Sequence, residues 1–184
     1  MAAQTIGPLA QDLPLQGELV EIRAFGPEDL TPEYVGWLND PEVVRYSNQR
    51  FRRHDARSCA AYLESFPGTG NLFLSVRRKD GRHAIGTMTV YHASHHGTAD
   101  VGILIGDRNA WGRGYGQDAW NTVVHWLARH PAVRKVTAGT VACNAGMLKL
   151  MERSGMKREA VRERQELIDG EPVDIVYFAK HRDD

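Results

Sequence analysis

The sequence predicts a mixed α/β fold, in which one sheet carries helices on both faces. The first observation is the order of elements along the chain: strand, two helices, three strands, helix, strand, helix and two strands. The second is residues 98–105, which alternate between apolar Ala99, Val101 and Ile103 and a set that includes Asp100 and Gly102. The third is a change of period after this strand, where apolar residues recur at helical spacing.

The first half of the chain supplies a strand and two helices before the sheet continues. Residues 19–23 read as a strand, and Pro27 then opens a helix whose apolar stripe includes Tyr34 and Leu38. Asn39-Asp40-Pro41 ends that helix, and a second helix covers about residues 54–66. Strands are predicted at residues 71–78 and 84–91, and they are joined by a hairpin turn at residues 79–82.

The second half alternates helices with strands. Trp120, Val123, Val124 and Leu127 lie on one side of a helix predicted at about residues 115–130. A strand follows at residues 135–141. A helix at residues 144–154 comes next, and Gly155 ends it. Two final strands flank the Asp169–Gly170 turn.

Composition limits the class of protein. The 184 residues suit one domain, and 23 basic residues balance 23 acidic ones, which argues against nucleic acid or a membrane surface as the main partner. The sequence shows neither a signal peptide nor an apolar run long enough to cross a bilayer, so we expect a cytoplasmic protein. Residues 1–17 are expected to form a flexible arm or a strand lent to a partner subunit, and residues 18–184 a single domain.

A glycine loop between the strand at residues 98–105 and the next helix is the strongest functional signal. Trp111-Gly112-Arg113-Gly114-Tyr115-Gly116 places three glycines at alternate positions, so the backbone can turn tightly and approach a ligand. The helix that follows offers unpaired N–H groups to a phosphate. The nucleoside-triphosphate loop is excluded because no Gly-Lys-Ser/Thr occurs, and the dinucleotide fingerprint is excluded by spacing and by the preceding hairpins.

The loop resembles the coenzyme A loop of the GNAT acetyltransferases, in the branch near the ribosomal-protein N-terminal acetyltransferases. A second stretch, from Asn144-Ala145-Gly146-Met147 to Glu152-Arg153-Ser154-Gly155-Met156, resembles the family's next motif. Together with Trp37-Leu38-Asn39-Asp40-Pro41, the likeness covers about residues 18–180. It implies a GNAT-like domain with a largely antiparallel sheet that is splayed at the coenzyme A site, and acetyl-CoA as co-substrate without a metal.

The resemblance also implies roles for individual residues. The backbone of Ile103, Leu104 and Ile105 would donate to the thioester oxygen. The pyrophosphate would be held by the loop and the first turn of the helix, and Asn144 would bond the pantetheine arm or act as a helix cap. The predicted loop residues are Trp111, Gly112, Arg113, Gly114, Tyr115, Gly116 and Gln117.

Proton transfer is less well defined by the sequence. Asp100 lies eleven residues before Trp111, where histone-acetylating relatives carry a glutamate base, so it is the candidate base, with a structural acid as the alternative. Many relatives have a tyrosine acid seven residues after the motif's asparagine, but this chain has Met151, which cannot donate a proton. Cys143 is expected to be a small buried core residue.

Acceptor specificity is expected in the segment 45–54 and in the final hairpin. Tyr46, Asn48, Gln49 and Arg50 form a polar stretch that suits a small hydroxylated amine, such as a nucleotide-linked amino sugar. The N-terminus of a protein, such as a ribosomal protein, is the alternative acceptor. A catalytically weak, coenzyme-A-binding regulatory domain is a third interpretation, and the apolar strands at both chain ends are compatible with a homodimer.

Overall fold

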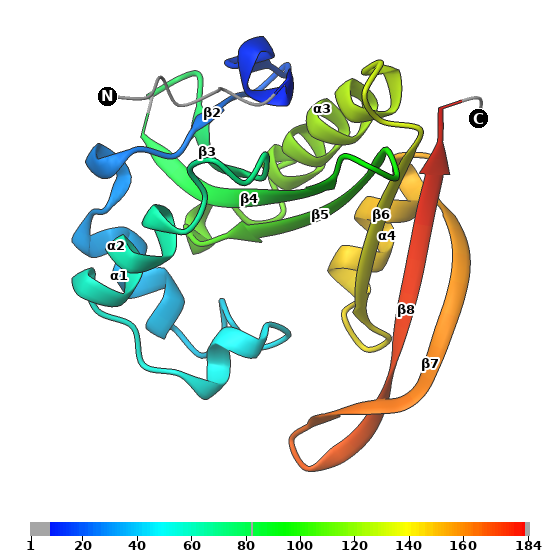
Figure 1. The fold of residues 1–184 in the computed structure, drawn as a ribbon. Helices are drawn as coiled ribbons and strands as arrows, with labels where there is room; N and C mark the ends of the chain where they lie inside the picture. Colours follow the sequence, from blue (N-terminus) through cyan, green and yellow to red (C-terminus); the bar gives the residue numbers. More distant parts are fainter. Residues whose placement is uncertain (1–7, 82, 183–184) are drawn as a thin grey trace.

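The structure, a computed structural model, describes residues 8–81 and 83–182, which form one eight-stranded sheet with helices on both faces (Figure 1). Neighbouring strands are antiparallel throughout except for β5 and β6, which are parallel, so the predicted largely antiparallel sheet is confirmed. Its strand order is β1-β2-β3-β4-β5-β6-β8-β7. The strands are β1 Leu15–Gln16, β2 Val20–Ala24, β3 Leu72–Arg78, β4 Ala84–Ala93, β5 Thr98–Ile105, β6 Lys135–Val141, β7 Lys157–Ile168 and β8 Glu171–His181.

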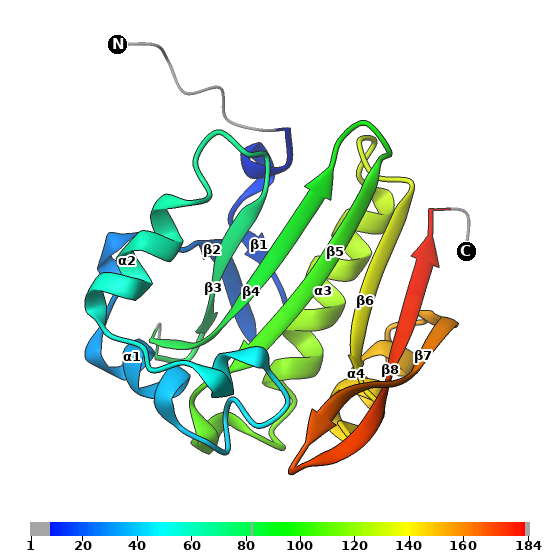
Figure 2. The same cartoon turned by 60° about the horizontal axis from the view of Figure 1, so that its bottom comes forward.

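Helices cover the two faces of the sheet in pairs (Figure 2). The main core joins α3 (Tyr115–Arg129) and α4 (Ala145–Arg153) to the sheet and includes the fully buried Trp120. A smaller aromatic cluster, which includes Phe73, lies under α1 (Pro32–Asn39) and α2 (Ala56–Glu64). The alternation predicted for β5 follows from this: Ile103 packs on the main core and Leu104 on the aromatic cluster.

The helix predicted to begin at Pro27 is divided. Residues Pro27–Asp29 form a short 3₁₀ helix, and α1 begins only at Pro32. Each piece has its own cap: the Asp29 carboxylate accepts from the Gly26 amide at 3.0 Å, and the Thr31 hydroxyl accepts from the Tyr34 amide at 3.2 Å. The periodic stripe is therefore real, but two capping side chains break the helix between its members.

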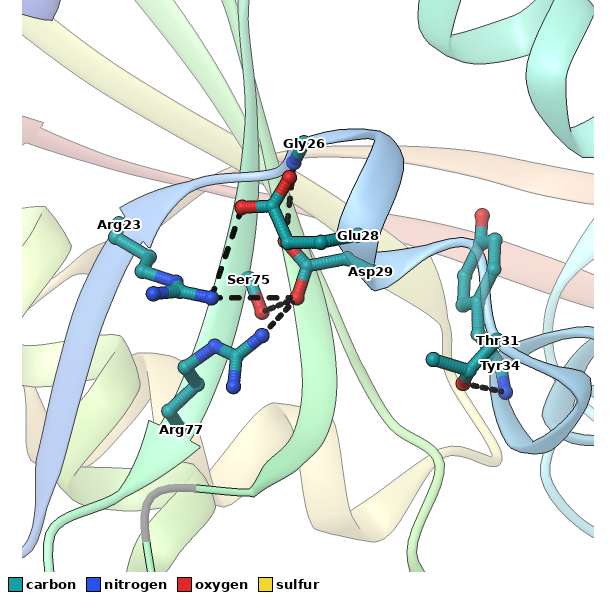
Figure 3. A network of polar contacts seen from close by, with 8 residues as sticks. All are labelled: Arg23, Gly26, Glu28, Asp29, Thr31, Tyr34, Ser75 and Arg77. Atoms are coloured by element: carbon teal, nitrogen blue, oxygen red, sulfur yellow. Dashed lines mark hydrogen bonds and ion pairs between the residues drawn. The ribbon is translucent and has the colours of Figure 1, made fainter.

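Asp29 also holds a buried polar network that joins this break to the sheet (Figure 3). Its side chain is fully buried and accepts from the Ser75 hydroxyl at 3.0 Å and from the Arg77 guanidinium. The Arg23 guanidinium lies 3.9 Å from the same carboxylate and is partly exposed. The network thus fixes the 3₁₀ turn against β2 and β3 through one charged group.

The N-terminal segment differs from the expected flexible arm. Residues 8–17 pack on the sheet, because Leu9 is fully buried in the main core and β1 pairs with β2. Trp126 of α3 also donates to the Asp12 carboxylate at 2.8 Å. Apolar burial and the open edge of β2 together account for this order. Residues 1–7 of the expected arm lie outside the described residues. No helix in the described ranges is long and apolar enough to cross a membrane.

Candidate functional site

The parallel strands β5 and β6 separate after only three pairs of residues. Pairing begins at Thr98 with Lys135 and ends at Asp100 with Thr137, although both strands continue. The other edge of β5 stays paired with β4 as far as Ile105, while β6 continues beside β8. The edge of β5 that faces β6 is therefore unpaired from Val101 to Ile105, which leaves backbone groups free for a ligand in a V-shaped opening (Figure 1).

Asp100 lies at the apex of this opening. The Thr137 hydroxyl donates to its Oδ1 at 2.6 Å, across the last pair of the two strands. Burial raises the pKa of the Asp100 carboxyl, and the hydrogen bond from Thr137 opposes that rise. A carboxylate whose charged form is partly desolvated is a stronger proton acceptor than a free one, as a general base requires.

A polar pocket of about 250 Å³ adjoins Asp100, and we call it the Asp100 pocket. It brings together β5, β6, the β7–β8 hairpin and the segment between α1 and α2, residues 40–55, which we call the α1–α2 segment. Its polar lining comes from Asp100, Tyr46, Asn48, Thr140, Glu166 and Tyr177. Two predicted acceptor residues thus share a pocket with the predicted base, whereas Glu166 and Tyr177 were placed by sequence only as part of the final hairpin.

Gly139 makes room for Tyr177 in this pocket. A Cβ atom at position 139 would lie 2.9 Å from a ring carbon of Tyr177, closer than side chains tolerate. The Arg162 guanidinium lies over the Tyr177 ring, 5.3 Å from its centre. The tyrosine ring is therefore held in place by a glycine of β6 and an arginine of β7.

A second pocket of about 420 Å³ lies on the α1 and α2 face, and we call it the aromatic pocket. Its floor includes Ile103 and Leu104 of β5, and its walls include Tyr62 and Tyr91, whose hydroxyls are 2.9 Å apart. Burial, followed by that hydrogen bond, raises the pKa of Tyr62. His54 also lines it, and its Nε2 is buried without a hydrogen-bond partner in the described residues.

The glycine loop leads from the end of β5 into α3. Gly112 and Gly114 have φ values of +70° and +87°, which a side chain would strain. The Trp111 indole N–H donates to the Ile105 carbonyl at 2.8 Å and fixes the loop to β5. Among the described hydrogen bonds, none is donated by the backbone amides from Arg113 to Gln117. They form a group of free donors at a helix N-terminus, as an anionic ligand requires.

The remaining predicted cofactor residues surround the same opening. The Asn144 side chain caps α4 by accepting from the Met147 amide at 3.2 Å, and it donates to the Thr140 hydroxyl at 3.1 Å. Gln117 donates to the Asn121 side chain at 2.9 Å, but its own Oε1 is buried without a partner in the described residues. Tyr115 instead points into the core, where its ring packs beneath Arg78. An unsatisfied buried oxygen beside the loop fits a site that binds a polar ligand.

Arg50 does not line either pocket. Its guanidinium donates to the Ser47 carbonyl at 2.8 Å and the Leu167 carbonyl at 3.1 Å, and lies 3.8 Å from the Glu166 carboxylate. Arg50 therefore joins the α1–α2 segment to the tip of the β7–β8 hairpin, because its planar fork can bond both. Gln49, by contrast, lines the aromatic pocket.

Two further expectations were tested by burial. Cys143 is exposed, so its prediction as a buried core residue is wrong; it lies in the turn that leads from β6 to α4. Met151 is fully buried in the main core, where a thioether packs well but supplies no proton.

In the ranges 8–81 and 83–182, no three His, Cys, Asp or Glu side chains are arranged to hold a metal ion.

Solved structures show the same fold. A GNAT-family acetyltransferase from Bacillus anthracis is 17% identical with a TM-score of 0.79, and the match covers 94% of this chain and 100% of that one. Spermidine N-acetyltransferase from Vibrio cholerae, in complex with CoA and spermine, is 16% identical with a TM-score of 0.78 and coverages of 90% and 96%. Ribosomal-protein-S5-alanine acetyltransferase from Vibrio fischeri is 18% identical with a TM-score of 0.77 and coverages of 94% and 98%.

Sequence comparison gives the family directly. No curated protein sequence matches the chain. The sequence profile described as the acetyltransferase (GNAT) domain matches residues 20–157, three quarters of the chain, and this range contains the V-shaped opening and the glycine loop. The chain therefore belongs to the GNAT acetyltransferase family.

Proposed function

We propose that the protein transfers the acetyl group of acetyl-CoA to the primary amine of a small polar acceptor bound in the Asp100 pocket. The observation that carries this proposal is the position of Asp100. Its carboxylate stands where β5 and β6 part, beside the unpaired edge of β5 and at the wall of a polar pocket. The same group could therefore meet both a thioester lying in the opening and an amine entering the pocket.

The residues of the opening fit coenzyme A. The free amides from Arg113 to Gln117 would bind the pyrophosphate, and the buried Gln117 Oε1 and the Asn144 side chain would face the pantetheine amides. The backbone N–H groups of the stretch Ile103, Leu104 and Ile105 that point to the unpaired edge would donate to the thioester oxygen as negative charge develops on it. Acetyl-CoA, when bound, supplies the activated acetyl group.

Asp100 would accept the proton that the amine must lose before or during attack. Its raised pKa suits this role better than an ordinary carboxyl pKa would, and the Thr137 hydrogen bond orients it. The buried Met151 offers no acid for the departing thiolate. Tyr46 and Tyr177 line the same pocket, so their hydroxyls are the candidate donors. Departure of the thiolate without a proton is the alternative, since thiolates are stable leaving groups.

The lining of the Asp100 pocket favours a small polar acceptor. Tyr46, Asn48, Thr140 and Tyr177 offer hydroxyl and amide groups suited to a hydroxylated molecule, of which a nucleotide-linked amino sugar is our leading example. The alternative acceptor is the N-terminus of a protein, whose last residue alone would enter a pocket of this size. The neighbours named for spermidine and for ribosomal protein S5 share the fold at low identity, so they do not decide between acceptors.

Release of free thiol from acetyl-CoA tests the proposal. The purified protein would be assayed with nucleotide-linked amino sugars, simple amines, spermidine and peptides with free N-termini. Amine-dependent thiol release, together with loss of acceptor turnover in Asp100→Asn, is the expected result. Tight binding of CoA with no turnover of any amine would overturn it in favour of a regulatory domain.

A further inference from the structure

The Asp100 pocket and the aromatic pocket are lined by neighbouring residues of the same two segments, the α1–α2 segment and β5. Alternate residues of the α1–α2 segment face the two sides: Tyr46 and Asn48 line the Asp100 pocket, and Gln49 lines the aromatic pocket. On β5, Asp100 belongs to one pocket and Gly102, two residues further along the same face of the strand, belongs to the other. An elongated acceptor could therefore occupy both. In Figure 2 the α1–α2 segment, drawn in cyan, passes the end of β5 towards the β7–β8 hairpin.

The two pockets carry opposite charges. Asp100 and Glu166 line the Asp100 pocket, and no described lysine or arginine lines it; Arg50 reaches Glu166 only from outside. The aromatic pocket has the reverse character. Arg52 and Arg53 line it with His54, and none of its described lining residues is an Asp or Glu.

The two arginines of the aromatic pocket are also without partners. In the part of the chain that the structure describes, neither the Arg52 nor the Arg53 side chain makes a hydrogen bond or an ion pair. His54 adds a buried Nε2 without a partner. Other cations near the site are used within the fold, as Arg50 is by Ser47 and Leu167. Free cationic groups beside a pocket are available to an anionic ligand.

We propose that the acceptor is an amine that carries an anionic group, a phosphate or a carboxylate. This rests on the proposed function. Its ammonium end enters the Asp100 pocket, where Asp100 and Glu166 attract it before deprotonation, and its anionic end lies at the rim of the aromatic pocket against Arg52 and Arg53. Tyr62, Tyr91 and the apolar floor accommodate a flat or apolar part between the ends. A second ammonium, as in a diamine, would meet the arginines instead.

A set of matched acceptors tests the charge preference. Amines of equal chain length would end in a phosphate, a carboxylate, a hydroxyl or a second amine, and kcat/KM would be measured for each. We expect the anionic amines to exceed the aminoalcohol by about 10-fold or more, as charge-assisted hydrogen bonds allow. The diamine should be the poorest. A larger effect for the phosphate than for the carboxylate assigns a phosphate, and the reverse assigns a carboxylate.

The double variant Arg52→Gln/Arg53→Gln should abolish this preference, because it should lower kcat/KM for the anionic amines far more than for the aminoalcohol. Arg57→Gln is the control, because it removes one positive charge from the neighbouring α2 at a residue that does not line the pocket. Inorganic phosphate should also compete with the aminoalcohol at saturating acetyl-CoA, and the double variant should lose this inhibition whereas the control keeps it.

Several results would overturn the inference without touching the proposed function. These are equal kcat/KM for the anionic and neutral amines, a preference for the diamine, or a preference that survives in the double variant. An equal loss of the preference for anionic amines in Arg57→Gln would show that the overall positive charge of this region causes the preference, and that contact with the pocket arginines does not. Failure to acetylate any amine would instead overturn the proposed function itself.

Discussion

The Thr137 hydroxyl bonds the Asp100 carboxylate at 2.6 Å across the last paired residues of β5 and β6. The contact therefore lies at the point where the sheet opens. One side chain orients the candidate base, and the strand separation gives that base access to a ligand. Because desolvation raises the pKa of this carboxyl, its protonation should control both the rate and the pH dependence of acetyl transfer.

Asp100→Asn should lower kcat/KM for the acceptor by about 100-fold or more, the usual contribution of a general base. The KM for acetyl-CoA should stay unchanged, because the pyrophosphate donors lie on the glycine loop. Steady-state kinetics with each substrate varied in turn would check this. Unchanged acceptor kinetics across the pH range would give Asp100 a structural role instead.

Thr137→Val should move the acid limb of the kcat/KM profile to higher pH. The valine removes a hydrogen bond that favours the charged carboxylate, so the already raised pKa of Asp100 rises further. Thr137→Ser keeps the hydroxyl and is the control. The same shift affects stability. Because the pKa of Asp100 is raised in the folded state, its contribution to the free energy of unfolding is complete below the unfolded-state pKa. That contribution is lost as the pH rises through the folded-state pKa. If the acid limb of the kcat/KM profile has the same midpoint in Thr137→Val as in the unchanged protein, the hydrogen bond from Thr137 does not lower the pKa of Asp100.

Gly114→Ala should raise the KM for acetyl-CoA several-fold and lower stability by about 1–2 kcal/mol, because an alanine at φ +87° is strained. The acceptor KM should not change. Gly36→Ala provides the control, since Gly36 lies in α1 with open space around it, and there alanine should stabilise by about 0.5–1 kcal/mol. Thermal unfolding and kinetics would measure both. Equal stability and equal KM for acetyl-CoA in the two variants would contradict a requirement for the positive φ of Gly114.

The sequence predicted the elements well where their periodicity was undisturbed. The strand at residues 135–141 has the predicted bounds, and the predicted helix at 115–130 differs from α3 by one residue. Two different causes explain the failures. Asp29 and Thr31 divide the first helix through local caps, each of which bonds an amide three residues away, and the apolar periodicity does not report them. Leu9 packs in a core formed from distant elements, which propensity within a short window does not contain.

The candidate site was predictable to a similar extent. Local motifs indicated the glycine loop and Asp100, because spacing along one strand and turn is fixed by the backbone. The meeting of Tyr46 with Glu166 and Tyr177 depends on how the hairpin folds back over the sheet, and only the general location in the final hairpin was expected. Arg50 is the clearest example: its residue type suggested a ligand, whereas in the structure its guanidinium bonds the carbonyls of Ser47 and Leu167 and lies near the Glu166 carboxylate.

Asp29→Ala should destabilise the protein by about 3 kcal/mol or more, because it leaves the guanidinium of Arg77 without its buried carboxylate and removes the cap on Gly26. Arg23→Gln should cost less than about 1 kcal/mol, since Arg23 is partly exposed and lies 3.9 Å from Asp29. Urea unfolding would measure both. Similar losses in the two variants would contradict the central role of Asp29.

Arg50→Ala should raise the acceptor KM by about 10-fold, with little change in the KM for acetyl-CoA. The guanidinium joins Ser47 to Leu167, so its loss should release the β7–β8 hairpin from the α1–α2 segment and widen the Asp100 pocket. Bonds to a charged donor of this kind contribute about 1.5–3 kcal/mol, which sets the expected size. Arg50→Lys should recover only part of the effect, because a single ammonium cannot reproduce the fork.

Arg45→Gln is the control for this contact. Arg45 also approaches the hairpin, 3.8 Å from Asp169, but both side chains are more than half exposed and the pair should contribute little. Hydrogen exchange of residues 164–172 should become faster in Arg50→Ala and stay unchanged in Arg45→Gln. If exchange rises in Arg50→Ala without any change in acceptor KM, the hairpin does not form part of the acceptor site. If neither changes, the contact does not hold the hairpin, and Arg50 does not set the shape of the Asp100 pocket.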